Sequence, residues 1–145
     1  MIKKILKKIG KNSIISQKEI ASAAHEKRNA VLKLSSEIIS KNTKKIIEAN
    51  KEDLLLANKA GLKESYIDRL LLDSKRISTI AESLISISTL PDPLSGKITK
   101  WERPNGLIIS KQPTPLGVLG IIYESRPNVT VDAAALCIKS GNSVI

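Results

Sequence analysis

Apolar residues between positions 16 and 90 recur every three, four or seven residues, with polar residues between them. The first such stripe comprises Ala24, Val31, Leu34 and Ile38. This spacing places the apolar side chains on one face of a helix, so the segment is predicted to form several amphipathic helices. The pattern ends at Pro91-Asp92-Pro93, and residues 1–93 are therefore interpreted as an amino-terminal helical segment.

Local signals mark where these helices begin and end. An S-x-x-E capping box predicts a helix that begins at Ser16. A helix over residues 43–60 is expected to end at Gly61, since glycine commonly follows the last helical residue. A short helix over residues 63–72 precedes Asp73, whose side chain is suited to capping a further helix.

Residues 1–11 place isoleucine and leucine on one helical face and lysine on the other. Two interpretations are open: the segment lies on a membrane surface, or it is a frayed first helix with a solvated basic face, which the sequence favours. No stretch of the chain approaches the roughly 20 apolar residues needed to span a bilayer. No membrane partner is expected.

Two strand-like runs, residues 97–103 and 107–112, flank Pro104-Asn105-Gly106. Asn-Gly between two such runs is a strong hairpin signal. Trp101 and Ile108 are mixed with charged residues, so neither face of the ribbon is cleanly apolar. We therefore predict a β-hairpin arm over residues 94–113, which either pairs with further polypeptide or lies on its own domain.

A nearly continuous apolar, β-branched run at residues 116–123 predicts a strand buried on both faces of a parallel sheet. A polar break follows, and an Ala- and Leu-rich helix is expected over residues 129–139, with Pro127 in its first turn and Gly141 at its end. Residues 143–145 begin another apolar run. This order predicts a parallel βαβ unit and an α/β fold class.

Functional residues of parallel βαβ units usually lie at the carboxyl ends of the strands, which places the candidate site at residues 123–128. Arg126 is suited either to binding a carboxylate or phosphate or to a structural ion pair with Glu124. Asn128 lies at the start of the predicted helix, which its side chain is suited to cap. Ser125 has no histidine nearby in the sequence, so a serine nucleophile is not expected.

Composition narrows the choice of partners. The 145 residues suffice for one domain with a core, and 24 Lys and Arg against 14 Asp and Glu give a net charge of +10. The lysines are scattered along the predicted helices and aromatic residues amount to only 2%, so no nucleic-acid partner is expected. A single cysteine excludes an internal disulfide. The lone His25 has no Cys or His at metal-ligand spacing, so no metal is expected.

Several motifs together carry a resemblance to a known family. They are Pro115-Leu116-Gly117-Val118-Leu119-Gly120, Tyr123-Glu124-Ser125-Arg126-Pro127-Asn128-Val129-Thr130, Asp132-Ala133-Ala134-Ala135-Leu136-Cys137 and Lys139-Ser140-Gly141-Asn142, with Glu48-Ala49-Asn50-Lys51-Glu52-Asp53, Asp68-Arg69-Leu70 and Arg103-Pro104-Asn105-Gly106-Leu107 before them. These segments closely resemble γ-glutamyl phosphate reductase, also called glutamate-5-semialdehyde dehydrogenase, in the aldehyde dehydrogenase superfamily. The resemblance covers most of the chain, but the chain covers only the beginning of the family's usual length.

The resemblance implies that the hairpin is an oligomerisation arm and that residues 114–145 begin a Rossmann-like NADP-binding domain of the aldehyde dehydrogenase type. It also implies NADPH-dependent reduction of L-glutamyl 5-phosphate to glutamate 5-semialdehyde, a step of proline biosynthesis in the cytoplasm. Self-association, or pairing with further domains, is expected through the hairpin. No cofactor-binding residue is assigned.

In the family's reaction a cysteine thiolate attacks the acyl phosphate, and preorganised donors stabilise the resulting oxyanion. On this chain the resemblance makes Asn128 the candidate oxyanion donor, and Arg126 and Ser125 the candidate substrate-binding residues. Cys137 is not expected to be the nucleophile, because it lies in an apolar helix where a thiol packs as a hydrophobic side chain. The family's nucleophile belongs to a later domain.

We therefore expect a truncated or degenerate form of this oxidoreductase that is inactive alone, since these residues supply too few parallel strands for a complete cofactor surface. The alternative is a non-enzymatic helical interaction module, or half of a split protein, that binds another polypeptide.

Overall fold

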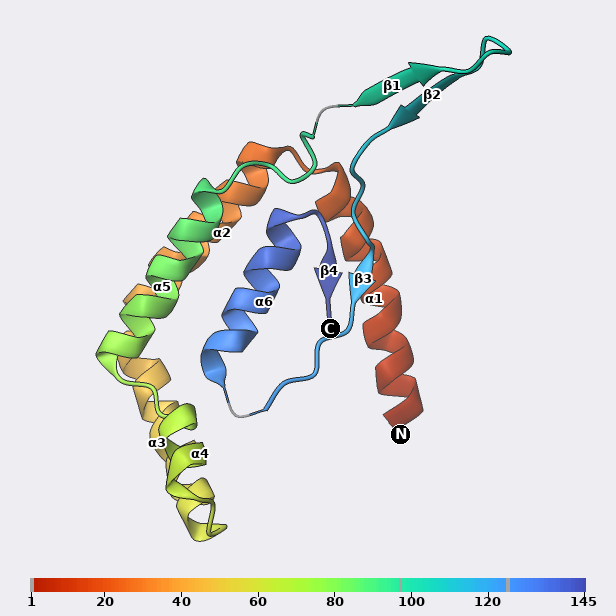
Figure 1. Cartoon of the computed structure of the whole chain (residues 1–145). Helices are drawn as coiled ribbons and strands as arrows, with labels where there is room; N and C mark the ends of the chain where they lie inside the picture. The colour runs from red at the N-terminus through yellow and green to blue at the C-terminus, as the bar shows by residue number, and fades with distance from the viewer. Residues whose placement is uncertain (1, 97, 125) are drawn as a thin grey trace.

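The structure is a computed structural model that describes residues 2–96, 98–124 and 126–145. Its helices are α1 (Ile2–Ser22), α2 (His25–Lys41), α3 (Thr43–Lys59), α4 (Glu64–Leu70), α5 (Ser74–Thr89) and α6 (Pro127–Lys139). Its strands are β1 (Thr99–Glu102), β2 (Ile108–Lys111), β3 (Val118–Leu119) and β4 (Ser143–Val144). Figure 1 shows α2 and α5 together on one flank, α1 on the other, and α6, β3 and β4 between them.

The hydrophobic core lies where α2, α5 and α6 meet. Leu32 of α2 and Leu84 of α5 are almost fully buried, and they pack with Ile87 and with Ala135 of α6. Burial of one leucine side chain contributes about 1.5–3 kcal/mol. The core therefore holds α6 against the paired helices α2 and α5 and fixes the direction in which the beginning of α6 points.

Two of the predicted helix boundaries are confirmed. Helix α3 ends at Lys59, and Gly61 follows with φ of 68°, a conformation that glycine adopts without a steric penalty. The carboxylate of Asp73 accepts a hydrogen bond from the backbone N–H of Arg76 at 2.7 Å and so caps α5, as predicted. These signals act within a few residues of each other, so distant packing does not override them.

The predicted helix start at Ser16 is wrong, whereas the helix with a solvated basic face that is predicted for residues 1–11 is present from Ile2 onward. Helix α1 runs without interruption through Ser16 from Ile2 to Ser22, and the break comes only at Ala24, whose ψ is 150°. Extending an existing helix costs less than nucleating a new one, so an internal serine does not begin a helix when the preceding turn is already helical.

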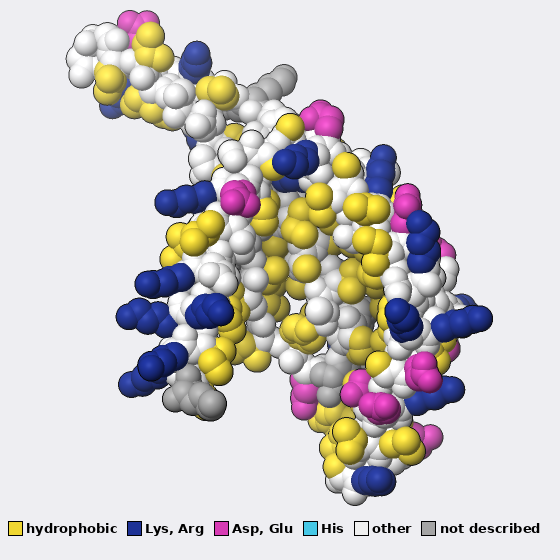
Figure 2. Space-filling model, turned by 180° about the vertical axis from the view of Figure 1, so that it is seen from behind, with side chains coloured by type: hydrophobic (Ala, Val, Ile, Leu, Met, Phe, Trp, Pro, Cys, Tyr) yellow, Lys and Arg dark blue, Asp and Glu magenta, His cyan; other side chains and the backbone are white. Residues whose placement is uncertain are grey.

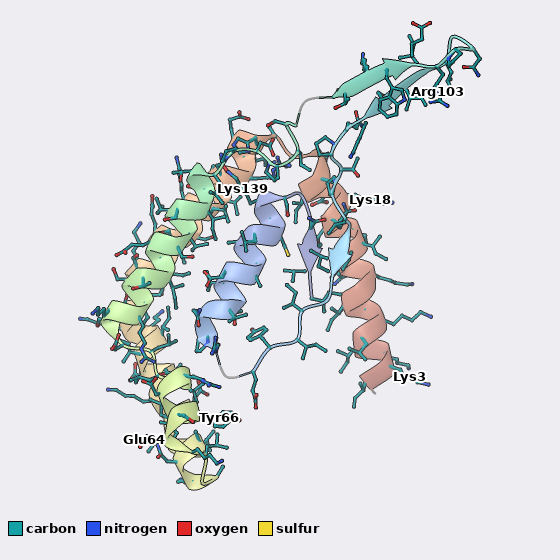
Figure 3. The ribbon with its side chains drawn as sticks, viewed as in Figure 1. Lys3, Lys18, Glu64, Tyr66, Arg103 and Lys139 are labelled. Atoms are coloured by element: carbon teal, nitrogen blue, oxygen red, sulfur yellow. The ribbon has the colours of Figure 1, made fainter. Side chains whose placement is uncertain are left out.

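Helix α1 packs beside β3 and β4 and carries most of its lysines outward, as Lys3 and Lys18 illustrate in Figure 3. Ile2 and Leu6 remain mostly exposed near its beginning. No helix in the part of the chain that the structure describes combines the length and apolar character needed to cross a membrane.

The predicted parallel βαβ unit is confirmed at the level of its topology. Strands β3 and β4 pair in parallel, with Val118 opposite Ser143 and Leu119 opposite Val144, and α6 connects them. Gly141 turns the chain after α6 with φ of 73°. A Cβ atom at this position would lie 3.0 Å from side-chain atoms of Leu94 and Pro115, so the turn also requires the absence of a side chain.

The first strand of this unit is much shorter than predicted. The sequence predicts a buried strand over residues 116–123, whereas β3 covers only Val118–Leu119, and Leu116 and Ile122 are 83% and 102% exposed. Backbone pairing with the β4 segment extends only from Gly117, which accepts from Ser143, to Ile121, which donates to Ile145. A strand needs a partner for each residue, and the described residues supply partners for this short stretch alone.

The predicted β-hairpin is confirmed, and it projects away from the helices (Figure 1). Strands β1 and β2 pair in antiparallel register, with Trp101 opposite Ile109, and Gly106 lies in the connecting turn. Both strands are largely exposed. The hairpin thus forms an arm rather than a ribbon lying on the body of the chain.

Figure 2 shows apolar side chains gathered in the hollow middle of one face, with Lys and Arg projecting from the two flanks. The largest exposed apolar side chains near the parallel pair belong to Leu116 and Ile122, with Leu136 and Ile145 about half exposed. The lysine-rich flanks follow the outer sides of helices, which agrees with a scattered basic bias rather than a single basic stripe.

Candidate functional site

A pocket of about 360 Å³ lies between the α4–α5 corner and the beginning of α6. Charged and polar residues on both of its walls include Asp68, Arg69 and Arg76 on one wall and Arg126 and Asn128 on the other. In Figure 1 the beginning of α6 lies on the same side of the molecule as α4. The pocket therefore joins two segments that are far apart in the sequence.

The structure places two of the three predicted site residues in this pocket. Arg126 is the residue that precedes α6, and Asn128 lies in the first turn of that helix. The third, Ser125, lies outside the described residues. No ion pair among the residues that the structure describes joins Arg126 to Glu124, and both side chains are exposed.

The side chain of Asn128 does not cap α6. Its Nδ2 atom donates to Oδ2 of Asp132 at 3.4 Å, one helical turn later. The other carboxylate oxygen of Asp132 accepts a hydrogen bond from the hydroxyl of Ser83 at 2.6 Å, which anchors Asp132 to α5. A carboxylate accepts hydrogen bonds and does not donate them, so the Asp132 carboxylate favours the orientation in which the nitrogen of the Asn128 amide faces it.

Arg76 fixes the opposite wall of the pocket. Its Nη2 atom lies 2.6 Å from Oδ1 of Asp68, and its Nη1 atom donates to the carbonyl of Leu71 at 3.1 Å and to the carbonyl of Asp68. These bonds tie the end of α4 to the first turn of α5. Arg76 thus has a structural role, and its charge is balanced by Asp68.

Arg69 also lines the pocket, and the sequence pattern alone gives it no role. It lies in the Asp68-Arg69-Leu70 segment of the resemblance, but nothing in the local pattern distinguishes it from other charged residues on helices. Its guanidinium lies over the ring of Tyr66, 5.6 Å from the ring centroid, and its side chain is exposed. Only the pocket lining, which joins α4 to the beginning of α6, places it in the same pocket as Arg126.

Cys137 is buried, as predicted, with 4% of its surface exposed. Burial raises the pKa of its thiol, because the apolar surroundings disfavour the thiolate. A raised pKa and low exposure both oppose nucleophilic reactivity. No cluster of three metal-ligating side chains occurs within residues 2–96, 98–124 and 126–145.

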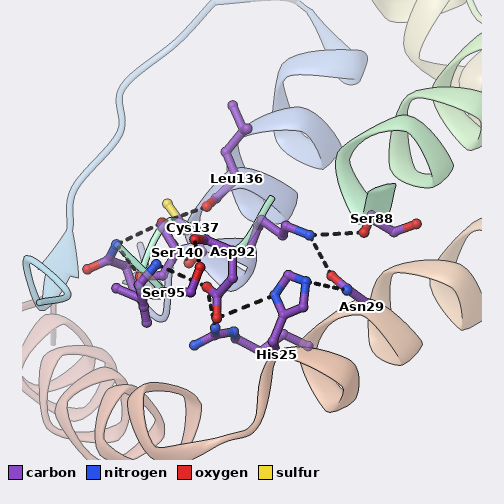
Figure 4. A network of polar contacts seen from close by, with 12 residues as sticks. His25, Asn29, Ser88, Asp92, Ser95, Leu136, Cys137 and Ser140 are labelled. Atoms are coloured by element: carbon purple, nitrogen blue, oxygen red, sulfur yellow. Dashed lines mark hydrogen bonds and ion pairs between the residues drawn. The ribbon is translucent and has the colours of Figure 1, made fainter. Parts of the chain in front are cut away.

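A second polar cluster is buried at the other end of α6 (Figure 4). The Nζ atom of Lys139 donates to Oδ1 of Asn29 at 2.7 Å and to the carbonyl of Ser88 at 2.9 Å. Nearby, Arg28 donates to Asp92 at 2.8 Å, and only 4% of the Arg28 surface is exposed. Burial lowers the pKa of Lys139, and the neighbouring Asp92 carboxylate opposes this shift.

This second cluster ties four segments together rather than facing a pocket. It joins α2, the end of α5, the connector that leads to the hairpin, and the end of α6. Its contacts are internal hydrogen bonds and one ion pair, and the nearby His25 lies 3.6 Å from Asp92 and shares a hydrogen bond with Asn29. We assign this cluster a structural role.

The fold and the pocket define a class: an α-rich chain with a short parallel βαβ unit and a polar pocket at the beginning of its crossover helix, the place where ligands commonly bind in α/β proteins. No protein-family profile matches the chain. Individual proteins do match the chain, and those described below share one name.

The chain is 45% identical over 144 residues to gamma-glutamyl phosphate reductase of Brucella suis biovar 1 (strain 1330), a match that covers 99% of this chain and 34% of that protein. It is 53% identical over 118 residues to the protein of the same name from Thermoanaerobacter sp. (strain X514), which covers 81% of this chain and 28% of that protein. The crystal structure of gamma-glutamyl phosphate reductase from Thermotoga maritima superposes with a TM-score of 0.87 at 38% identity, over 92% of this chain and 32% of that one.

The corresponding structure from Saccharomyces cerevisiae gives a TM-score of 0.86 at 33% identity, over 94% of this chain and 35% of that chain. The chain therefore matches, over almost its whole length, the amino-terminal part of proteins named gamma-glutamyl phosphate reductase, and the resemblance seen in the sequence is confirmed. It spans about a third of the length of these relatives. The alternative of a non-enzymatic interaction module is not favoured by these matches.

Proposed function

We propose that this chain forms the amino-terminal part of the substrate site of a reductase that converts L-glutamyl 5-phosphate to glutamate 5-semialdehyde with NADPH, a step of proline biosynthesis. One observation carries the proposal. Arg126 and Asn128, two side chains that the sequence alone singles out, lie together in a pocket of a chain that matches gamma-glutamyl phosphate reductases over nearly all its residues.

The chemistry of the reaction suits these two side chains. An acyl phosphate carries negative charge that a guanidinium binds well, which fits Arg126. Reduction of the acyl group develops negative charge on its oxygen, and a preorganised amide donor stabilises that charge. Asn128 supplies such a donor from the first turn of α6, where its Nδ2 atom lies 3.4 Å from Oδ2 of Asp132. Ser125, next to Arg126, is retained as a further substrate contact, although it lies outside the described residues.

NADPH supplies the hydride when it is bound. Dinucleotides commonly lie across several parallel strands, and the described residues form only one parallel pair, β3 and β4. These residues do not by themselves form a cradle for the cofactor. We therefore assign no cofactor contact to this chain and derive no step through NADPH.

The nucleophile of the reaction is proposed to lie outside these 145 residues. Cys137, the single cysteine of the sequence, is buried and its pKa is raised, so it is unsuited to attack a substrate. The polypeptide of residues 1–145 is therefore expected to be inactive by itself.

The β1–β2 arm is proposed to mediate assembly. Its exposed apolar side chains include those of Trp101, Leu107 and Ile108, which are 43%, 57% and 68% exposed. Each strand has one edge that pairs within the hairpin and one edge that faces solvent. Exposed strand edges with apolar side chains favour pairing with another chain.

A chimeric enzyme tests the proposed function. Residues 1–145 would replace the matching amino-terminal part of the Thermotoga maritima enzyme, and NADP-dependent oxidation of glutamate 5-semialdehyde in phosphate, the reverse reaction, would be measured. We expect turnover by the chimera and none by the 145-residue polypeptide. A chimera that melts cooperatively near the temperature of the parent but shows no turnover would contradict the proposal.

A further inference from the structure

We propose that Arg69 is a second anion contact of the pocket, and that Arg69 and Arg126 together hold a small ligand with an acidic group at each end of a short aliphatic chain. The inference rests on the proposed function and extends it. In L-glutamyl 5-phosphate, the phosphate would contact Arg126 and the α-carboxylate would contact Arg69.

The pocket lining carries an excess of positive charge, with Arg69, Arg76 and Arg126 against Asp68. Asp68 is the carboxylate of the pocket lining, and Arg76 already neutralises it through their 2.6 Å ion pair. No ion pair within the described parts of the chain involves Arg69 or Arg126. Arg69 and Arg126 therefore line one pocket without a counterion among the described residues, and an anionic ligand would balance their positive charge.

Arg69 is also held in place before any ligand binds. Its guanidinium lies over the ring of Tyr66, and the last turn of α4 that carries it is tied to α5 by Arg76. Such restraint reduces the side-chain entropy that is lost on binding. An arginine that simply extended into solvent would lack both restraints.

The shape of the pocket matches a ligand with two charged ends. Arg69 and Arg126 come from different walls, and the apolar side chains of Leu72 and Ile80 lie among the lining residues. A volume of about 360 Å³ falls in the range of sites for small molecules. A ligand with an acidic group at each end would contact one arginine with each group. Its methylene groups would lie against the apolar residues of the pocket.

The inference is tested by measuring the binding of three probes to the 145-residue protein at constant ionic strength. The probes are inorganic phosphate, L-glutamate, and the phosphonate analogue of L-glutamyl 5-phosphate in which a methylene phosphonate replaces the acyl phosphate. Dissociation constants come from amide chemical-shift titrations, which also show whether the resonances of α4 and α6 respond. The analogue is expected to bind at least about tenfold more tightly than either inorganic phosphate or L-glutamate, as expected when two charge-assisted contacts replace one.

Two variants separate the contacts. Arg69→Gln is expected to raise the dissociation constant of the analogue about tenfold and to leave that of inorganic phosphate unchanged. Arg126→Gln is expected to raise both dissociation constants. Arg69→Lys should recover part of the loss. Arg103→Gln, at the remote hairpin turn (Figure 3), is the matched control and should change nothing. The side chains of Arg69 and Arg126 are exposed, so each variant is expected to keep the melting temperature of the parent.

The outcomes distinguish this inference from the proposed function. If Arg126→Gln weakens the analogue and Arg69→Gln does not, the role of Arg69 is wrong and the proposed substrate contact at Arg126 stands. If neither phosphate nor the analogue shifts the resonances of α4 and α6, the inference is wrong and the proposed substrate site loses its support as well. If Arg103→Gln weakens the analogue as much as Arg69→Gln does, binding is diffuse and the two-point site is overturned.

Discussion

The Oδ1 atom of Asn50 accepts a hydrogen bond from the backbone N–H of Leu72 at 2.7 Å, so a side chain of α3 fixes the corner between α4 and α5. The same side chain donates through Nδ2 to the carbonyl of Leu70 at 2.9 Å. Asn50 is 4% exposed, and its two bonds satisfy backbone groups that neither helix can pair internally. This corner carries one wall of the candidate site.

Asn50→Ala is expected to destabilise the protein by about 1–3 kcal/mol, because the partly buried backbone groups of Leu70 and Leu72 lose their partners. Urea unfolding followed by circular dichroism measures the change. Asn58→Ala is the control, since Asn58 is exposed and bonds only to Leu54 within its own helix. Equal unfolding midpoints for the two variants would show that Asn50 does not hold the corner.

Asp92→Asn is expected to lower the free energy of unfolding by about 3 kcal/mol, because Arg28 would keep its charge in a buried position without its counterion. Replacing Arg28 by Met in the same variant should recover part of this loss. The control is Glu37→Gln, which breaks the exposed ion pair with Lys41 and should cost less than about 1 kcal/mol. A loss for Asp92→Asn as small as that of the control would contradict the structural role assigned to this cluster.

Lys139 is expected to make stability depend on alkaline pH. Its pKa in the folded protein is lowered by burial, despite the opposing effect of Asp92, from an ordinary value of 10.5. At a pH between the folded and the unfolded pKa of Lys139, the unfolded chain binds the proton and the folded chain does not. The free energy of unfolding therefore increases as pH rises through this range. This increase is complete above the unfolded pKa and is lost as pH falls through the folded pKa.

The measurement compares the parent with Lys139→Met from neutral pH to pH 10.5 by urea unfolding, since Met cannot titrate. The free energy of unfolding of the parent, relative to that of Lys139→Met, should increase as pH rises. Arg28 and Asp92, the charged neighbours of this amine, are present in both proteins. A difference that stays constant over this range, or moves in favour of Lys139→Met, would show that burial does not lower this pKa.

The hairpin arm is expected to drive self-association. Sedimentation velocity should show a concentration-dependent rise in mass, and Ile108→Lys should weaken association at least about tenfold, because a charge on a strand face opposes pairing. Leu55→Lys tests whether any new charge has this effect, since Leu55 is 61% exposed on α3, away from the hairpin. A parent protein that remains monomeric at high concentration, with hairpin amides already protected from exchange, would contradict this role.

Features set by adjacent residues could be predicted from the sequence. The caps at Gly61 and Asp73, the Asn105-Gly106 turn and the order strand, helix, strand around α6 depend on interactions within a few residues. Local patterns pointed to residues 123–128, and the resemblance added the expected chemistry, namely substrate binding by Arg126 and oxyanion stabilisation by Asn128.

Features that depend on distant packing could not be predicted. The length of β3 is set by how far β4 pairs with it, which apolar residues alone do not reveal. The Lys139 amine reaches Asn29 across 110 positions, and no periodicity in the sequence indicates that contact. Arg69 gained a candidate role only when α4 was seen to share a pocket with the beginning of α6.

The most direct test of the central claim is the turnover of the chimeric enzyme after Asn128→Ala. Loss of an oxyanion donor commonly lowers kcat by about 10²–10³-fold, and that loss is expected here with little change in melting temperature, because Asn128 is exposed. Asn58→Ala in the same chimera should keep the parental kcat. If Asn128→Ala leaves kcat equal to that of Asn58→Ala, the beginning of α6 is not part of the reacting site.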